Sequence, residues 1–394
     1  MTARAWLAAT VLLAFSSIAA AQSVSRSTFS ELEDIQALVE ADRPAEAQAR
    51  LKVLVAETAN LPYDNAIANQ YLAHTSVMLD QSDIARAALE RALAAPELPP
   101  DLVSELKMFY GTVLLGQQEF ELARSVLNEW LAGVDSVKSS QLFSVAYANY
   151  QAGDLARAEP LLLRAIEQNR NPPLSWFQVY YQVLFDQKKF ELAGEVLHEA
   201  LTRGPNDRLL WRMLANHHIA LEESRDALAV LMVAYINELA NEPDELRQLV
   251  SMFGYVDIPE KGARLLQRWL DGGVLERDKE TLLQLGNLWL LARERTNAKA
   301  VLRDATAISP DSGTFELLAG IHFEDEEWSQ AHTAFQAALN AGGVQEPERI
   351  SFLAGVSAFR AGETAEARAA LTRAAESEEF RAQAQSLLQK LDSG

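Results

Sequence analysis

Histidine and acidic side chains are the residues best able to do chemistry in this 394-residue chain, because it contains no cysteine. Without cysteine there is no thiolate nucleophile, no disulfide and no cysteine-based metal site. Six histidines are present, and two of them, His217 and His218, are adjacent. Neighbouring side chains of a helix point in different directions, so this pair predicts one packed and one surface histidine and not a metal site.

Spaced motifs that place catalytic groups or cofactors are absent from the sequence. It has no HExxH pair, no GxSxG turn, no P-loop and no GxGxxG, each of which positions its reactive groups by fixed spacing. The acidic run from Glu324 to Glu327 lacks the alternate-residue ligand spacing of a calcium loop, which favours a solvated turn. We therefore expect no catalytic residues, no cofactor and no metal.

The stretch from Phe190 to Pro205 shows that the histidine and acidic side chains are carried by predicted helices. Val196, Ala200 and Leu201 recur at the spacing of one helix face, and glutamates fall on another face. The pair Gly204-Pro205 is a signal for the end of a helix. A second apolar helix is predicted over residues 176–185, so the two helices form a hairpin with a short turn between them.

The same hairpin recurs along the chain, with a small residue near the start of each second helix at intervals of 33 to 38 residues. These small residues are Ala47, Ala85, Ala123, Ala158, Ala193, Ala227, Gly262, Ala298, Ala331 and Ala367. Four positions after each comes a large apolar residue, namely Leu51, Leu89, Leu127, Leu162, Leu197, Leu231, Leu266, Leu302, Phe335 and Leu371.

This hairpin and its period resemble the tetratricopeptide repeat (TPR) family, whose repeat is about 34 residues long. The resemblance implies an all-α fold, a TPR-like α-solenoid. We expect a right-handed superhelix of about ten helical hairpins that ends in a C-terminal capping helix, because a solenoid needs its last apolar face covered.

Glycines occur at two kinds of position in these hairpins. Gly111, Gly286 and Gly355 fall where the two helices of a repeat cross, and Gly153 and Gly362 fall in the turn within a repeat. A crossing glycine lets two helices approach closely, and a turn glycine adopts positive φ without strain. Both kinds of glycine therefore support the hairpin assignment.

Prolines mark the ends of the predicted helices. Pro44 and Pro259 are placed at the start of second helices, where the missing N–H costs nothing. Pro205 and Pro310 follow the ends of second helices. Pro160 lies several residues inside its helix, so we expect a local kink or a late helix start there.

The N-terminal residues have the form of a signal peptide. Arg4 precedes an apolar run from Ala5 to Ile18, and Ala19-Ala20-Ala21 follows as a cleavage site. An uncleaved anchor is the alternative, but the apolar run is short for a membrane span and no stop-transfer pattern follows. The mature chain is then periplasmic, without a transmembrane segment. The predicted organisation is a signal peptide over 1–21, a TPR solenoid over 22–374 and a capping helix over 375–394.

The formal net charge of −20 limits the classes of partner. Phosphates of nucleic acids and anionic membrane surfaces would be repelled. Proteins and peptides, basic ones among them, remain as partners.

The TPR resemblance also implies where a partner would bind, because first helices of TPRs line a concave groove. The corresponding positions combine aromatic rings, amides and two arginines, which suit apolar, backbone and carboxylate contacts. They are Phe143, Tyr147, Tyr150, Gln178, Gln182, Phe185, Arg212, Asn216, Arg247, Ser251, Tyr255 and Asn287. In the alternative interpretation, Tyr147 and Phe185 pack between first helices and bind nothing.

Arg212 and Asn216 loosely resemble half of the carboxylate clamp of some TPR co-chaperones. The other clamp positions hold Gln248 and Glu280, which do not match, so recognition of a C-terminal tail is not predicted.

Residues 175–375 also resemble, in their general residue pattern, one group of exported TPR proteins. These are the proteins encoded beside the TonB, ExbB and ExbD energy-transduction genes of Gram-negative bacteria. The similarity rests on residues 262–273, 285–294 and 315–328. It implies a non-enzymatic accessory factor for TonB-dependent outer-membrane transport, with TonB-, ExbB- or ExbD-type partners. A general scaffold for outer-membrane or peptidoglycan assembly is one alternative. A small-molecule binder or enzyme is another, and it would need a closed pocket with convergent titratable groups.

Overall fold

The computed structural model describes residues 24–393, and every regular element in this range is an α-helix. The helices form two compact units, divided between Pro205 and Asn206. The predicted signal peptide, residues 1–21, lies outside the described residues. Within residues 24–393, no helix has both the length and the apolar character needed to cross a membrane.

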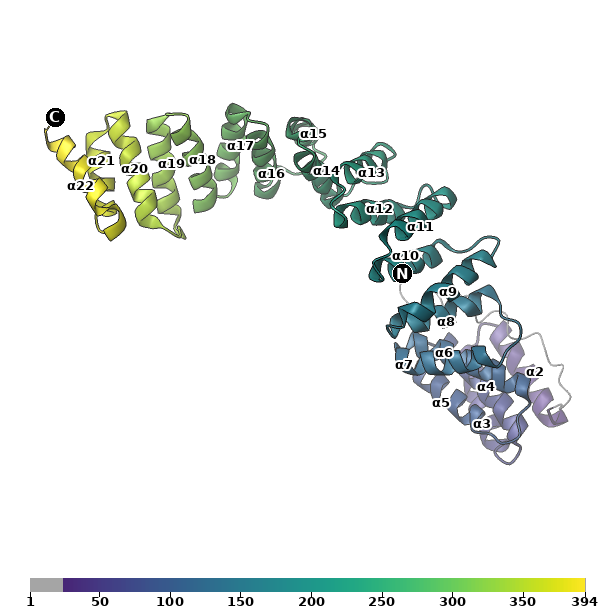
Figure 1. The fold of residues 1–394 in the computed structure, drawn as a ribbon. Helices are drawn as coiled ribbons and strands as arrows, with labels where there is room; N and C mark the ends of the chain where they lie inside the picture. Colours follow the sequence, from purple (N-terminus) through teal and green to yellow (C-terminus); the bar gives the residue numbers. More distant parts are fainter. Residues whose placement is uncertain (1–23, 394) are drawn as a thin grey trace. The chain divides into compact units, whose positions relative to one another are not determined.

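The first unit contains five helical hairpins, each formed by two consecutive helices (Figure 1). Their bounds are α2 (Arg26–Glu40), α3 (Pro44–Glu57), α4 (Pro62–Met78), α5 (Ser82–Leu93), α6 (Pro100–Gly116), α7 (Phe120–Ala132), α8 (Ser139–Gln151), α9 (Leu155–Glu167), α10 (Leu174–Asp186) and α11 (Phe190–Arg203).

The second unit contains five more hairpins and one final helix. Their bounds are α12 (Arg208–Ala220), α13 (Ser224–Ile236), α14 (Pro243–Tyr255), α15 (Pro259–Asp271), α16 (Lys279–Leu291), α17 (Arg295–Ile308), α18 (Ser312–Glu324), α19 (Trp328–Ala341), α20 (Pro347–Ala361), α21 (Thr364–Ala374) and α22 (Glu378–Ser393).

Hairpins stack side by side within each unit, as Figure 1 shows for α18 to α21. Within each unit, each helix packs against its neighbours in the chain, and additional contacts join first helices of successive hairpins, such as α8 with α10 and α14 with α16. First helices therefore form the inner layer of each stack. The prediction of an all-α, TPR-like solenoid of ten hairpins is confirmed.

Ten turns, one within each hairpin, share one backbone conformation. The N–H of the residue before each second helix bonds to the carbonyl five residues earlier, as Lys189 does to Leu184 at 2.9 Å. This bond is the signature of a Schellman turn, which needs a residue with positive φ. Gly153 and Gly362 supply it in two hairpins, as predicted, with φ of 80° and 81°. The other eight turns use residues with a Cβ, namely Asp42, Asp80, Gln118, Lys188, Glu222, Asp257, Arg293 and Glu326.

Crossing glycines let the two helices of a hairpin touch. A Cβ on Gly111 would lie 2.4 Å from Cγ of Leu127, and one on Gly355 would lie 2.7 Å from Cγ of Leu371. Both leucines are fully buried, and both belong to the series that follows the small residues by four positions. The predicted crossing positions are therefore confirmed at these two hairpins, and Gly286 faces Leu302 in the same way at 3.0 Å.

Prolines occupy the predicted helix ends, with one correction. Pro44 and Pro259 are the first residues of α3 and α15, while α11 and α17 end two residues before Pro205 and Pro310. Of the two alternatives expected at Pro160, a local kink or a late helix start, the late start is wrong, because α9 begins at Leu155 and runs through the proline. Asp154 caps this helix by accepting a hydrogen bond from the N–H of Arg157 at 3.2 Å, which fixes its start ahead of Pro160.

Candidate functional site

A hollow of about 620 Å³ lies in the second unit between α14 and α16. Both are first helices, so the hollow opens on the inner layer of the stack. Its wall combines large apolar side chains with a few polar groups, which is the composition of a ligand site. The lining residues are Ser251, Gly254, Tyr255, Glu280, Leu283, Gln284, Asn287, Leu288 and Leu291.

The apolar part of the hollow is exposed to solvent. Tyr255 and Leu291 are the last residues of α14 and α16, and 75% and 62% of their surfaces are accessible. Gly254 leaves room for Leu291, because a Cβ at this glycine would lie 3.3 Å from Cδ1 of Leu291. Large apolar side chains that share one exposed wall mark an interaction surface more strongly than scattered ones do.

Gln284 holds the polar wall in place. Its Nε2 donates to the carbonyl of Arg247 at 2.8 Å and to Oγ of Ser251 at 2.6 Å. Its Oε1 is buried and has no hydrogen-bond partner among the described residues. An unpaired buried carbonyl costs about 1–3 kcal/mol, and the two hydrogen bonds donated by Nε2 hold the amide in this orientation.

Glu280 is the one charged residue among those that line the hollow. Arg247 of α14 is paired with Asp244 at 2.6 Å. Asp278 is the N-cap of α16. A hydrogen bond from the Thr281 N–H lowers the pKa of Asp278, so this carboxylate stays ionised. The hollow therefore presents negative charge to a ligand.

Three of the predicted groove residues, Ser251, Tyr255 and Asn287, line this hollow, and Arg247 adjoins it through the carbonyl that Gln284 binds. Arg212 and Asn216, also in the second unit, lie on α12 and are exposed. Asn216 accepts a hydrogen bond from Nε2 of Gln248 at 3.2 Å. The structure places these two residues outside the hollow.

The six predicted residues of the first unit lie on α8 and α10. Phe143 is buried, with its ring 4.9 Å from that of Trp176 and 6.0 Å from that of Tyr147. Tyr147 and Tyr150 are partly exposed, and burial raises the pKa of each.

On α10, Gln178, Gln182 and Phe185 are partly exposed. Gln182 donates to Oδ1 of Asp186 at 2.7 Å, and the ring of Phe185 lies 5.0 Å from that of Phe190. The first contact lies within α10, and the second joins α10 to the second helix of its own hairpin, α11.

Six of the nine lining residues were not selected from the sequence as groove positions, namely Gly254, Glu280, Leu283, Gln284, Leu288 and Leu291. Glu280, Leu283, Gln284, Asn287 and Leu291 follow one another on α16 at spacings of three and four residues, which is one helix face. Only Asn287 was chosen from this face. The helical periodicity around Asn287 was the signal that could have found the rest.

The acidic turn between α18 and α19 is neutralised by bases of the preceding helix. Arg295 pairs with Asp325 at 2.6 Å, and Lys299 pairs with Asp325 and Glu327 at 2.8 and 2.7 Å. Lys299 is only 7% exposed. Its hydrogen bonds to both carboxylates outweigh the effect of burial and raise its pKa. The predicted turn is present with Glu324 and Glu326 exposed, and its other two carboxylates, Asp325 and Glu327, are held in ion pairs.

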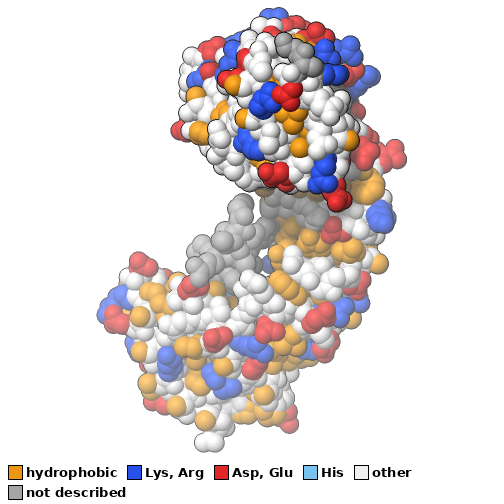
Figure 2. Space-filling model, turned by 90° about the vertical axis from the view of Figure 1, so that its left-hand side faces the viewer, with side chains coloured by type: hydrophobic (Ala, Val, Ile, Leu, Met, Phe, Trp, Pro, Cys, Tyr) orange, Lys and Arg blue, Asp and Glu red, His pale blue; other side chains and the backbone are white. Residues whose placement is uncertain are grey.

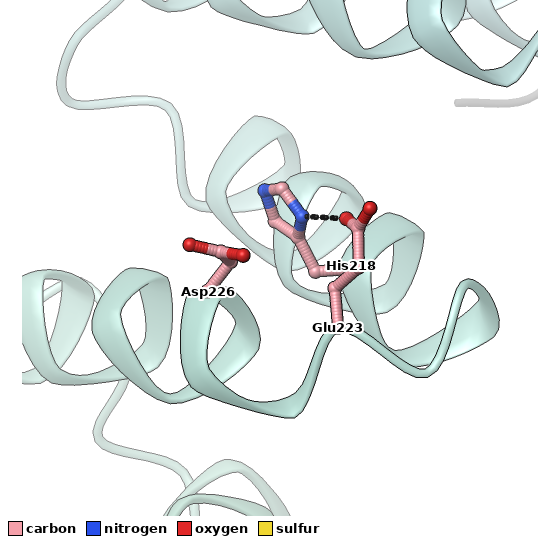
Figure 3. Close-up of side chains that lie close together, drawn as sticks. All are labelled: His218, Glu223 and Asp226. Carbon is pink, nitrogen blue, oxygen red and sulfur yellow. Dashed lines mark hydrogen bonds and ion pairs between the residues drawn. The ribbon is translucent and has the colours of Figure 1, made fainter.

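One group of side chains has the ligand types of a metal site. His218, Glu223 and Asp226 lie together at the turn between α12 and α13 (Figure 3), with ligand atoms within 4.8 Å of one another. His217 is 3% exposed, whereas the side chain of His218 is 16% exposed, so one histidine packs and the other reaches the surface, as expected.

A family model for the tetratricopeptide repeat matches residues 78–137 and 317–386. The chain carries tetratricopeptide repeats. One matching segment lies in each unit, and the TPR hairpins between them have the same Schellman turns. No curated protein matches the sequence.

Solved TPR structures are similar to parts of the chain. YrrB, described as a TPR protein with an unusual peptide-binding site, is 15% identical over 46% of this chain and 89% of its own, with a TM-score of 0.40. The C-terminal part of a TPR protein from Cytophaga hutchinsonii is 15% identical over 71% of this chain and 95% of its own, at a TM-score of 0.45. MamA from Desulfovibrio magneticus is 14% identical over 46% of this chain and 98% of its own, with a TM-score of 0.41.

Proposed function

We propose that this TPR protein is a non-catalytic scaffold that binds a protein or peptide segment in the hollow between α14 and α16. The observation that carries the proposal is the joint exposure of Tyr255 and Leu291 on one wall. Burying an exposed side chain of this size yields about 1.5–3 kcal/mol. Two such anchors beside polar groups give a peptide both affinity and orientation.

The favoured ligand is an extended segment with an apolar residue flanked by a basic one. Glu280 provides the only charge of the lining residues, and the whole chain carries a net charge of −20. The side-chain amide of Asn287 can bond to backbone groups of such a segment. Helices hold these groups in place before binding, so little free energy is lost in ordering the site.

We further propose that the protein works in the periplasm as an accessory factor of TonB-dependent outer-membrane transport. Support comes from the signal-like N-terminal residues and from the similarity of residues 175–375 to exported TPR proteins encoded with TonB, ExbB and ExbD. A Lys- and Pro-rich linker, typical of TonB, has the basic charge that Glu280 favours. Edman sequencing of the exported protein should give a mature N-terminus at Gln22.

Binding in the hollow is tested with a fluorescent Lys- and Pro-rich peptide and the mature chain. Replacing both Tyr255 and Leu291 by alanine should weaken binding at least about tenfold, the scale of losing interface anchors. The matched control is Ile236→Ala, which removes an apolar side chain that is 69% exposed on α13 and outside the hollow. Equal affinities of the double variant and the control would refute binding at this wall.

Partners in the cell are identified by a photo-crosslinking amino acid at Asn287, with the same probe at Ile236 as control. Capture of TonB-, ExbB- or ExbD-type proteins only at Asn287 supports the transport proposal. Capture of outer-membrane or peptidoglycan assembly proteins would keep the site and replace the function by the scaffold alternative. Equal labelling at the two positions would mean that the hollow is not the working surface.

A further inference from the structure

We propose that His218, Glu223 and Asp226 form a binding site for a divalent transition-metal ion such as Zn²⁺. The site is separate from the hollow between α14 and α16 and does not depend on peptide binding. Imidazole and carboxylate are the nitrogen and oxygen ligands that this class of metal prefers.

Backbone geometry brings the three side chains together. His218 lies in the last turn of α12, and its carbonyl accepts the Schellman-turn hydrogen bond from the N–H of Glu223 at 2.9 Å. Glu223 is the N-cap of α13, and Asp226 lies in the first turn of that helix. In Figure 3 the imidazole lies between the two carboxylates, with Nδ1 2.7 Å from Oε2 of Glu223.

A second hairpin of the same unit contains the same pair of side chains. His322 and Glu327 occupy the corresponding places of α18 and α19, and the backbone bond between them is 2.8 Å long. Nδ1 of His322 also bonds to Oε2 of Glu327. The turn therefore brings a histidine and a glutamate at these two positions within hydrogen-bond distance of each other. Whether such a pair can also bind a metal ion depends on the charged residues around it.

The two hairpins differ in how the carboxylate is neutralised. Lys299 donates to Glu327 at 2.7 Å, so a lysine ammonium supplies the positive charge there. Around Glu223 and Asp226, no lysine or arginine of residues 24–393 comes within ion-pair distance. A second carboxylate, Asp226, stands where the other hairpin has Gln330. This site has more negative charge and no fixed cation, which favours an external one.

The distances suit a small cation after minor side-chain movement. Metal–ligand bonds of about 2.0–2.2 Å place ligand atoms about 3–4 Å apart, against the present limit of 4.8 Å. Glu223 and Asp226 are exposed, so an ion can enter and keep water in its remaining positions.

The test is calorimetric titration of the metal-free mature chain with Zn²⁺. One ion should bind per chain, and His218→Ala or Asp226→Asn should each weaken binding by more than about 100-fold, which exceeds the usual effect of changes outside the ligand set. His198→Ala is the matched control, because it removes an exposed histidine elsewhere and should leave binding unchanged. Circular dichroism checks that the variants remain folded.

Absorption of the Co²⁺-loaded chain gives an independent readout, since the d–d bands report the ligand set. These bands should change in His218→Ala and stay the same in His198→Ala. The proposal is overturned if the intact chain binds no Zn²⁺, if Zn²⁺ binding is the same in all variants, or if Ca²⁺ binds in its place.

Discussion

At the scale of single residues, the partly buried His74 of the first unit links stability to pH. His74 stacks on Phe109 with ring centroids 4.1 Å apart, and its Nδ1 is enclosed without a hydrogen-bond partner among residues 24–393. Burial lowers the pKa of His74 from 6.5 to about 4. The folded protein therefore holds this imidazole neutral over a range in which the unfolded chain protonates it.

Protonation should make the first unit less stable as the pH falls. Because the folded-state pKa is the lower one, the stability is complete above about pH 6.5 and is lost between there and about pH 4. The loss is on the order of 3 kcal/mol. Urea unfolding at several pH values should show this slope, and His74→Phe should reduce it.

The control for this prediction is His198→Phe, which changes an exposed histidine. Carboxylates also titrate in this range, so the decisive quantity is the difference in slope between each variant and the parent chain. If His74→Phe and His198→Phe leave the same pH dependence, the neutral buried state of His74 is not what limits stability in acid.

At the scale of helices, the crossing glycines predict an effect opposite to helix propensity. Gly111→Ala adds a methyl group 2.4 Å from Cγ of Leu127, and overpacking of this kind costs about 1–3 kcal/mol. The gain in helix propensity of about 1 kcal/mol should not offset it. We expect thermal unfolding to show a lower midpoint for the variant.

Gly320→Ala provides the contrast on α18. A Cβ at Gly320 has no atom within 4 Å, so only the propensity gain of about 0.5–1 kcal/mol remains. The two alanine substitutions should shift stability in opposite directions. A stabilised Gly111→Ala would show that the helices of its hairpin can separate without cost.

The last helix gives a second prediction at this scale. α22 packs against α20 and α21, where Phe380 stacks on Phe352 at 5.3 Å and covers the buried Leu371. Ending the chain at Ala375 exposes this apolar face, so amides of α21 should lose protection from hydrogen exchange while those of α16 keep theirs.

Asp392→Asn is the control for removing α22, because it breaks only the ion pair with Arg368 at 2.6 Å. An exposed pair of this kind contributes about 0–1 kcal/mol. Comparable exchange in the truncated chain and in Asp392→Asn would contradict a capping role for the helix.

Sequence periodicity was sufficient for the hairpins because each one is fixed locally. The small residue, the large residue four positions later and the turn all lie within one repeat, as the contacts of Gly111 and Gly355 show. The hollow depends on two repeats at once. Tyr255 was selected, but Leu291 was missed because its exposure follows from Gly254 on a different helix.

The His218 cluster was missed for a related reason. His217 and His218 were considered as a pair, whereas the ligand set joins His218 to residues five and eight positions later across a turn. The Schellman bond that aligns them is a backbone feature without a residue signature, since eight of these turns use residues other than glycine.

At the scale of the whole molecule, net charge and local charge give different expectations. The chain carries a formal charge of −20, yet Figure 2 shows acidic and basic side chains interspersed over the face drawn. Attraction of a basic segment then has a diffuse part from the whole chain and a local part from Glu280 at the hollow. Salt screens the diffuse attraction by the whole chain much more readily than the local attraction by Glu280.

This separation leads to a prediction for the Lys- and Pro-rich peptide. Raising the ionic strength from about 0.01 M to about 1 M shortens the screening length from about 30 Å to about 3 Å, so association should slow by about tenfold or more. Dissociation should change less, because apolar contacts with Tyr255 and Leu291 are not screened. Stopped-flow anisotropy measures both rates. A matched peptide with Gln in place of Lys should associate at a rate independent of salt, and equal salt dependence of the two peptides would contradict electrostatic attraction by the chain.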